Sequence, residues 1–195
     1  MYELKDRSWL FVFTGPDGSG RKSVAEAVGH TFGMEKIVSY VTRQPRPGEV
    51  NGQDYRFISH DSYREMESHG EFLESVEIDG NLYGIRSLDV ESMLEKHDSA
   101  YLILNREGAT ILKKIYGDKV VRLFLYADRR TVEERQRKLG LPDDVISQHL
   151  GHYDTEMEYR GFCEHAFENY DLAQTTYEIT NTLENYLQRD LVDKD

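Results

Sequence analysis

The chain has 195 residues, enough for a single domain with a sizeable hydrophobic core. Its 24 basic and 36 acidic residues give a formal net charge of −12, which argues against a nucleic-acid backbone or an anionic membrane as the main partner. Because positions 143–195 hold 13 acidic and only 3 basic residues, a site for an anionic ligand must lie before them.

The first predicted element is a short apolar strand over residues 10–13, which ends at a glycine-rich turn. Four continuously apolar residues are too few for a helix and are typical of a buried parallel strand. Gly15, Gly18 and Gly20 follow, and glycines let successive backbone N–H groups converge on an anion where the next helix begins, near Arg21. This order predicts a phosphate-binding P-loop. The alternative is an ordinary strand-to-helix turn whose glycines only make it tight.

The P-loop pattern, G-x-x-x-x-G-K-[ST], fits from Gly15 to Gly20 but fails directly afterwards. Arg21 occupies the lysine position, Lys22 occupies the hydroxyl position, and Ser23 lies one place beyond. Arg21 can neutralise phosphate charge, although its planar guanidinium fits less well between two phosphates than a compact ammonium does. A turn one residue longer would return Lys22 and Ser23 to their usual roles. We favour the usual length, because residues 15–20 already close the loop.

Helices and strands then alternate, with one interruption. A helix should run to about residue 31 and a second strand should span residues 37–40. Between residues 42 and 84, prolines, glycines, aromatic residues and charges break any long period, which indicates an inserted subdomain. Within it we expect a strand at 55–58, a helix at 61–68 and a hairpin over 71–84 that turns at Asp79-Gly80.

The core pattern resumes with helices at 88–95 and 107–115 and strands at 101–104 and 120–126. Strands alternating with helices predict an α/β protein with a P-loop NTPase-type parallel sheet flanked by helices. Two mostly polar helical stretches, 130–138 and 143–159, are joined at Gly140-Leu141-Pro142 and would suit a mobile lid. A short segment at 172–175 and a closing helix at 180–191 complete the chain. We therefore expect one domain, 1–195, with a core (1–41, 85–134 and 160–195), an insertion (42–84) and a lid (135–159).

Two arginines stand on one stiff turn in the insertion. Pro45 and Pro47 restrict the backbone on either side of Arg46, so little entropy is lost when Arg43 and Arg46 face one anion. A phosphomonoester is the natural ligand, and Ser39 and Tyr55 could add hydroxyl donors. The alternative, judged equally good on chemistry alone, is a proline-stiffened surface loop whose arginines are incidental.

The stretches SYVTRQPRPGEVNGQDYRF and EFLESVEIDGNLYG closely resemble the guanylate kinase family, and the resemblance covers nearly the whole chain. It implies ATP with Mg²⁺ on the P-loop and GMP in the insertion. The implied GMP site comprises Ser39, Arg43, Arg46, Tyr55, Glu74, Tyr83 and Asn105. Glu74 would accept hydrogen bonds from the N1–H and N2–H₂ groups of guanine, a pair of donors that adenine lacks. Without the family resemblance, the pattern around Glu74 would indicate only an exposed glutamate on a strand.

The ATP phosphates would be bound by the residues of the P-loop and the helix start: Gly15, Gly18, Ser19, Gly20, Arg21, Lys22 and Ser23, with Ser23 as the candidate Mg²⁺ ligand. Arg21 or Lys22, Arg43 and Arg135 are the candidates for stabilising charge during transfer.

The sequence also departs from the family. Ile103 and Asn105 stand where the family carries aspartates, one of which helps to bind guanine. Ile85 replaces a small hydroxyl residue after the hairpin, and His149 stands where a second lid arginine is expected. Loss of a guanidinium is costly for phosphoryl transfer. Together with the altered P-loop, these changes resemble the non-catalytic guanylate kinase-like domains of scaffold proteins.

The expected function is therefore ATP-dependent phosphorylation of GMP to GDP. The alternative is a weak or inactive module that binds GMP, or a phosphorylated protein partner, in the same cleft. A third option, another P-loop monophosphate kinase, is suggested by the likeness of GPDGSG to thymidylate kinase P-loops, but the RQPRPGEVNGQDY stretch argues against it.

Cellular location is predicted from cysteine usage and apolar runs. The single cysteine, Cys163, allows no intramolecular disulfide. The opening MYELKDRSWL lacks the apolar core of a leader peptide, and no apolar run approaches membrane-spanning length. We expect a cytoplasmic protein without nucleic-acid or membrane partners.

Overall fold

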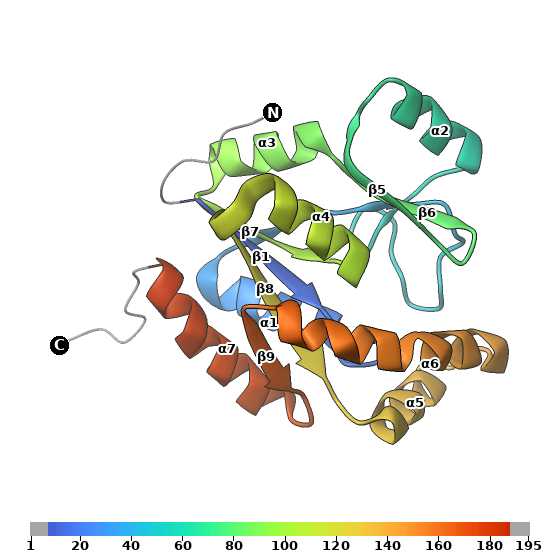
Figure 1. The fold of residues 1–195 in the computed structure, drawn as a ribbon, viewed down its shortest axis with the longest axis vertical. Coiled ribbons are helices and arrows are strands. Elements are labelled where there is room, and N and C mark those ends of the chain that lie inside the picture. Colours follow the sequence, from blue (N-terminus) through green and yellow to red (C-terminus); the bar gives the residue numbers. More distant parts are fainter. Residues whose placement is uncertain (1–7, 188–195) are drawn as a thin grey trace.

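A computed structural model describes residues 8–187 of the chain. Its centre is a five-stranded sheet in the order β2-β7-β1-β8-β9, in which every pair of neighbours is parallel (Figure 1). The strands are β1 (Trp9–Thr14), β2 (Glu35–Lys36), β7 (Ser99–Ile103), β8 (Val120–Tyr126) and β9 (His165–Glu168). The predicted α/β fold with a parallel sheet is therefore confirmed.

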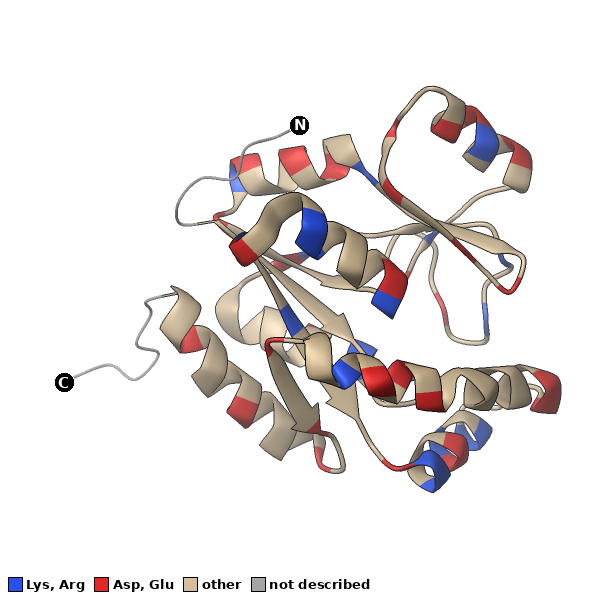
Figure 2. Ribbon diagram, viewed as in Figure 1, with Lys and Arg blue, Asp and Glu red and all other residues tan. Residues whose placement is uncertain are grey.

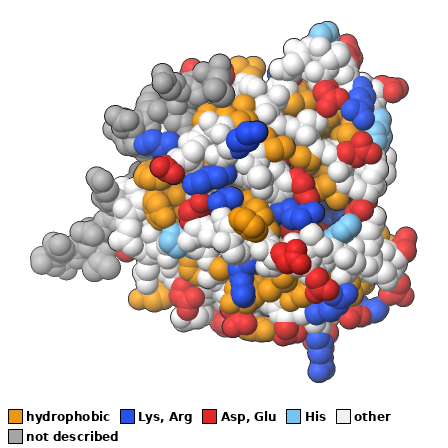
Figure 3. Space-filling model, viewed as in Figure 1, with side chains coloured by type: hydrophobic (Ala, Val, Ile, Leu, Met, Phe, Trp, Pro, Cys, Tyr) orange, Lys and Arg blue, Asp and Glu red, His pale blue; other side chains and the backbone are white. Residues whose placement is uncertain are grey.

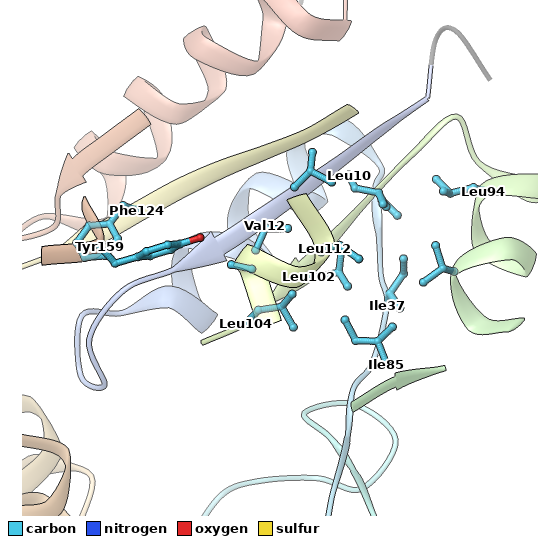
Figure 4. Packing of buried hydrophobic residues seen from close by; sticks show 14 residues of the cluster. Leu10, Val12, Ile37, Ile85, Leu94, Leu102, Leu104, Leu112, Phe124 and Tyr159 are labelled. Atoms are coloured by element: carbon cyan, nitrogen blue, oxygen red, sulfur yellow. The ribbon is translucent and has the colours of Figure 1, made fainter. Parts of the chain in front are cut away.

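Both faces of the sheet are covered, which explains why β1 is apolar at consecutive positions. Leu10 and Val12 pack on one face with helices α3 (Ser87–Lys96) and α4 (Arg106–Tyr116), as Figure 4 shows for Leu94 and Leu112. Side chains alternate along a strand, so Phe11 and Phe13 point to the other face. There they pack with α1 (Arg21–Phe32) and α7 (Leu172–Leu187).

The insertion forms a second sheet, in the order β4-β3-β6-β5. Its strands are β3 (Tyr40–Val41), β4 (Arg56–Phe57), β5 (Phe72–Ile78) and β6 (Asn81–Arg86), and α2 (His60–Ser68) packs on it. The β5–β6 hairpin turns at Asp79-Gly80, where both residues have positive φ (52° and 74°), as predicted. Tyr63, on α2, is fully buried and stacks on Phe72, so this small sheet has a core of its own.

The stretch expected to form a lid, 135–159, takes in the end of α5 (Arg129–Lys138) and all of α6 (Asp143–Glu158), two helices that lie beside the carboxyl end of β8 (Figure 1). Along α5, one pair of adjacent acidic residues lies between basic residues at both ends of the helix (Figure 2). Short 3₁₀ turns, η1 (Gly117–Lys119) and η2 (Tyr159–Phe162), precede β8 and β9. Within residues 8–187, no helix combines the length and apolar character needed to cross a membrane.

Three sequence predictions about elements are wrong. The expected strand at 37–40 is mostly the connection between two strands of different sheets, β2 and β3: the chain leaves the first sheet after Ile37 donates to the Tyr101 carbonyl and joins the second at Tyr40. Strand β9 was not expected, since its polar residues give no apolar run. The segment at 172–175 and the closing helix are one helix, α7, capped by the Asp171 side chain; residues 188–191 of that expected helix lie outside the described part.

Candidate active site

The P-loop of the sequence analysis is a compact turn of the usual length. Gly15, Gly18 and Gly20 all have positive φ (131°, 84° and 89°), and α1 begins directly afterwards at Arg21. A Cβ at Gly15 would collide with the carbonyl oxygen of Leu125, so the loop requires glycine there for space as well as for backbone conformation. The glycines thus bring the loop backbone to the start of α1, where N–H groups are free to bind an anion.

Arg21 lines both of the cavities described below, whereas Lys22 lines only the larger of the two. The Arg21 guanidinium donates to Asp17 (Nη2–Oδ1 2.8 Å) and to the carbonyl of Leu104 (3.3 Å). Burial opposes the charge of Arg21, but Asp17 together with Tyr55, Glu156 and Tyr83 raises the pKa of its guanidinium above the ordinary value. Lys22 is half-exposed, and its Nζ lies 2.5 Å from Oδ1 of the buried Asp54 in the insertion. Arg21 therefore stands at the lysine position of a loop of ordinary length.

The chain's own residues do not provide the usual P-loop ligand for a magnesium ion. The hydroxyl position carries Lys22, whose ammonium is already paired with Asp54. Ser23 is exposed on the next helical position and lines the larger of the two cavities described below. Among residues 8–187, no group of three or more His, Cys, Asp or Glu side chains could hold a metal ion.

The segment from residue 43 to 55, here called the monophosphate loop, is organised by Glu49. Its carboxylate accepts two hydrogen bonds from Arg43 (2.6 and 2.7 Å) and one from the backbone N–H of Arg46 (2.7 Å). Arg43 also lies over the Tyr55 ring, 5.0 Å from its centroid, and Tyr55 contacts Tyr83 edge-on. Burial opposes the charge of Arg43, but Glu49 raises its pKa. Sequence reasoning missed Glu49; its position three residues after Arg46 on a proline-stiffened turn was the available signal.

A cavity of about 320 Å³ brings most of the predicted residues together between the core, the insertion and α6. Figure 3 shows charged and histidine side chains around the hollow between the β5–β6 hairpin and α6. The lining includes, of the predicted residues, Gly15, Arg21, Ser39, Arg43, Arg46, Tyr55, Glu74, Tyr83 and Asn105. Arg21 thus approaches from the P-loop side and Arg43 and Arg46 from the insertion.

A second cavity, of about 720 Å³, shares several lining residues with the first and is also lined by Gly18, Gly20, Lys22, Ser23 and Arg135, among others. Arg135 donates to the carbonyls of Asn169 (2.7 Å) and Ser19 (3.5 Å). Ser19 is fully buried under the loop, and it lines neither cavity. Arg137, further along α5, pairs instead with Glu133 and Asp143 on the surface.

Glu74 lies at the far end of the smaller cavity and is 4% exposed. Burial raises the pKa of its carboxyl to about 7. Its side chain passes so close to α4 that a Cβ at Gly108 would lie 2.5 Å from Oε1. Asn105 caps the same helix, and its Oδ1 accepts from the Gly108 N–H at 2.8 Å. The oxygen that the sequence analysis offered to guanine is therefore already engaged by the backbone.

Comparisons with known proteins show the family of the chain. The guanylate kinase family model matches residues 7–186. The chain belongs to the guanylate kinase family. The guanylate kinase of Trichodesmium erythraeum is 32% identical over 178 residues, covering 90% of this chain and 92% of that protein. That of Nitrosomonas europaea is 28% identical over 179 residues, covering 91% and 89%.

A solved structure, the guanylate kinase from Anaplasma phagocytophilum, has the same fold. It matches with a TM-score of 0.77 at 24% identity, over 95% of this chain and 89% of that one. His149, one of the departures noted in the sequence, is bonded to residues from two other segments. His149, at the expected lid arginine, lies against Arg46 and against Gln136 of α5, and Gln136 in turn donates to the backbone of Asp17. Sequence analysis assigned no role to Asp17 or Gln136, which lie 119 positions apart.

Proposed function

We propose that the protein transfers the γ-phosphoryl group of ATP to GMP, giving ADP and GDP. The observation that carries this proposal is that arginines line one cavity from two parts of the chain. Arg21 belongs to the P-loop side, and Arg43 and Arg46 belong to the insertion. Such a cavity suits two phosphates that must be brought in line. Membership of the guanylate kinase family and the buried Glu74 support guanine as the base of the acceptor.

Each residue has a proposed task in this reaction. The backbone of residues 15–20 and Arg21 bind the β- and γ-phosphates of ATP, and Arg135 extends the charge of that site from the lid. Ser39, Arg43, Arg46, Tyr55 and Tyr83 bind the GMP phosphate, while Glu74 accepts from the guanine donors. No covalent protein intermediate is needed, because positioning and charge neutralisation supply the catalysis. The cytoplasm, where both nucleotides are available, is the proposed location.

Magnesium is proposed as the companion of ATP, where it would neutralise phosphate charge. Because Lys22 stands at the hydroxyl position and is held by Asp54, we assign the ion no P-loop hydroxyl ligand at that position. Ser23 as a ligand remains a prediction.

The second candidate is a GMP-binding module without turnover, which none of the comparisons favours, and its physical rationale is the pairing of the arginines. The guanidinium groups of Arg21 and Arg43 are each already compensated by a carboxylate of the chain, Asp17 and Glu49. Phosphates must compete with these carboxylates, which weakens the charge available to a transition state.

A coupled assay of ADP release separates the two candidates. We expect release to require GMP and to be far slower with AMP. Arg43→Ala should lower GMP-dependent turnover at least tenfold, whereas Arg64→Ala, which removes an exposed arginine of the same insertion, should not change it. If the protein binds GMP but releases no ADP, it is the binding module without turnover. If it uses GMP and AMP equally well, guanine is not the base that the acceptor site selects.

A further inference from the structure

His149 is the least expected residue of the active site, and both of its ring nitrogens are engaged. The side chain projects from α6 and is buried, with the residue 8% exposed. Nδ1 lies 2.5 Å from Oε1 of Gln136, and Nε2 lies 2.9 Å from Nη2 of Arg46. The imidazole thus stands between the lid helix α5 and the monophosphate loop.

These contacts fix the protonation state of the ring. Gln136 donates from Nε2 to the Asp17 carbonyl at 3.2 Å, so its amide oxygen is the atom that faces His149. An amide oxygen only accepts, and therefore Nδ1 carries the hydrogen. A guanidinium only donates, and therefore Nε2 is the bare acceptor for Arg46. The geometry requires a neutral imidazole, and burial, with Arg46 and Arg21 nearby, lowers the pKa of His149 in the same sense.

Through these bonds one side chain connects three parts of the molecule that surround the cavity. Gln136 joins the ring to the backbone of the P-loop, α6 carries the ring itself, and Arg46 belongs to the monophosphate loop. Glu49 holds the backbone of Arg46, but its carboxylate is bonded to the guanidinium of Arg43 and not to that of Arg46. Within residues 8–187, the hydrogen bond described for the Arg46 guanidinium is the one to His149, and this bond fixes the position of the guanidinium.

We propose that His149 is a positioning residue for the acceptor phosphate: as a neutral ring oriented by Gln136, it accepts a hydrogen bond from Arg46 and holds that guanidinium in the GMP phosphate site. The proposal rests on the proposed function, in which Arg46 binds that phosphate. Under this proposal the lid both contributes the charge of Arg135 and, through His149, positions Arg46. Only when α6 lies over the cleft is Arg46 held in place, so acceptor binding and lid closure are linked.

Protonation of His149 should break this arrangement. A protonated ring has no acceptor for Arg46, and the two cations would then face each other. Oδ2 of Asp17 lies 4.0 Å from Nε2 and would attract the charged ring instead. Arg21, in the P-loop, opposes the added charge, and Asp79, on the hairpin, favours it. GMP should therefore bind more weakly once the ring is protonated.

Calorimetric titration of GMP and guanosine between pH 5 and 8 tests the proposal without depending on turnover. His149→Ala should weaken GMP about tenfold and leave guanosine unchanged, because Arg46 is assigned to the phosphate. His149→Gln can present an amide oxygen near the Nε2 position, so it should restore GMP affinity to within about threefold of the wild type. Gln136→Glu keeps the acceptor for Nδ1–H but adds a negative charge, which should raise the pKa of His149 and move the acid loss of GMP affinity to higher pH.

His152→Ala is the matched control. His152 lies on the same helix, is half-exposed and bridges to Asp79 of the hairpin (3.1 Å), so it links lid and insertion without contacting Arg46. The His152→Ala variant should change the affinities for GMP and for guanosine by the same factor. Because the GMP phosphate and Glu74 titrate in every variant, the contribution of His149 is the difference between the wild type and His149→Gln.

Equal GMP affinity of wild type and His149→Ala, or equal losses for GMP and guanosine, would overturn the proposal. Failure of His149→Gln to restore affinity would do the same. A wild type that binds GMP but releases no ADP would refute the proposed catalysis alone, whereas a wild type that binds no GMP would refute both.

Discussion

The carboxyl of Glu74 makes the affinity for guanine depend on pH within the physiological range. The two donors of the guanine edge require an ionised carboxylate, and burial raises the pKa of Glu74 to about 7. The competent fraction of the protein is then about 0.9 at pH 8 and about 0.1 at pH 6, and apparent affinity scales with that fraction. We expect the dissociation constant for guanosine to be about tenfold larger at pH 6 than at pH 8, which corresponds to about 1.4 kcal/mol.

Guanosine is the suitable ligand for this test because it lacks the phosphate of GMP, whose second pKa of about 6 would add its own pH dependence. Calorimetric titration at several pH values gives the curve directly. Glu74→Gln should bind guanosine weakly and without this pH dependence. Glu156→Gln is the control, because burial also raises the pKa of Glu156 to about 7 and Glu156 lines the same cavity. A flat wild-type curve, or loss of the pH dependence in Glu156→Gln, would refute the assignment.

The same carboxyl should lower the stability of the free protein. In the unfolded chain Glu74 releases its proton near its ordinary pKa of 4.5, but in the folded protein only near 7. Between these values the unfolded state binds fewer protons, so the free energy of unfolding falls as pH rises. The cost approaches about 3 kcal/mol above pH 7, which is an upper bound. Glu74→Gln should therefore melt at a higher temperature than the wild type at pH 8, and an unchanged or lower melting temperature would show that the carboxylate is well solvated.

Three further changes test other parts of the structure. Gly108→Ala should weaken GMP without affecting ATP, as measured by calorimetry, because its Cβ would lie 2.5 Å from Glu74 Oε1; unchanged GMP affinity would mean that the carboxylate can move aside freely. Arg21→Lys with Lys22→Ser should raise the turnover number in the coupled assay, while Lys22→Ala alone should do little, and an inactive Lys22→Ala protein would reverse the roles given to the two residues. Arg122→Met should lower the free energy of unfolding in urea by about 2 to 3 kcal/mol, because the buried guanidinium bonds Glu164, Tyr159 and the Phe162 carbonyl while Lys113 remains to compensate Glu164. Arg130→Met removes a surface pair with Glu134 and should cost less than about 0.5 kcal/mol, so a similar loss for both variants would contradict the burial argument.

Sequence patterns predicted best those elements whose local and tertiary requirements agree. Strand β8 was expected at residues 120–126 and lies there, because an apolar run is what a strand buried on both faces needs. The turn at Asp79-Gly80 was found because two positive φ angles restrict the choice of residues. Strand β9 was missed because an edge strand with partly exposed positions carries no such run. The expected strand at 37–40 was wrong because its division between two sheets is decided by Tyr101 and Gly84, which are remote in the chain.

The active site divides in the same way. Arg43, Arg46 and Tyr55 lie within one stretch of chain, so their joint use could be expected from spacing alone. Glu49 was within that stretch too, but its hydrogen bonds to both arginines depend on the loop conformation. Gln136, the partner of His149, could not be predicted, because the contact exists only once the two lid helices pack. The pairing of Lys22 with Asp54 is likewise a consequence of how the insertion sits on the core.

The strands at which the chain enters and leaves the insertion are paired with each other. Tyr40 faces Gly84 and Val41 faces Tyr83 in an antiparallel ladder, so the two ends stand only about 5 Å apart. A segment attached in this way can be shortened, enlarged or exchanged for another without disturbing the register of the parallel strands beneath it, because a tight turn would suffice to close the gap. Acceptor choice and the chemistry of the donor can therefore evolve separately in this architecture, and a transplanted insertion would bring its own small core, built on Tyr63 and Phe72, to the new host.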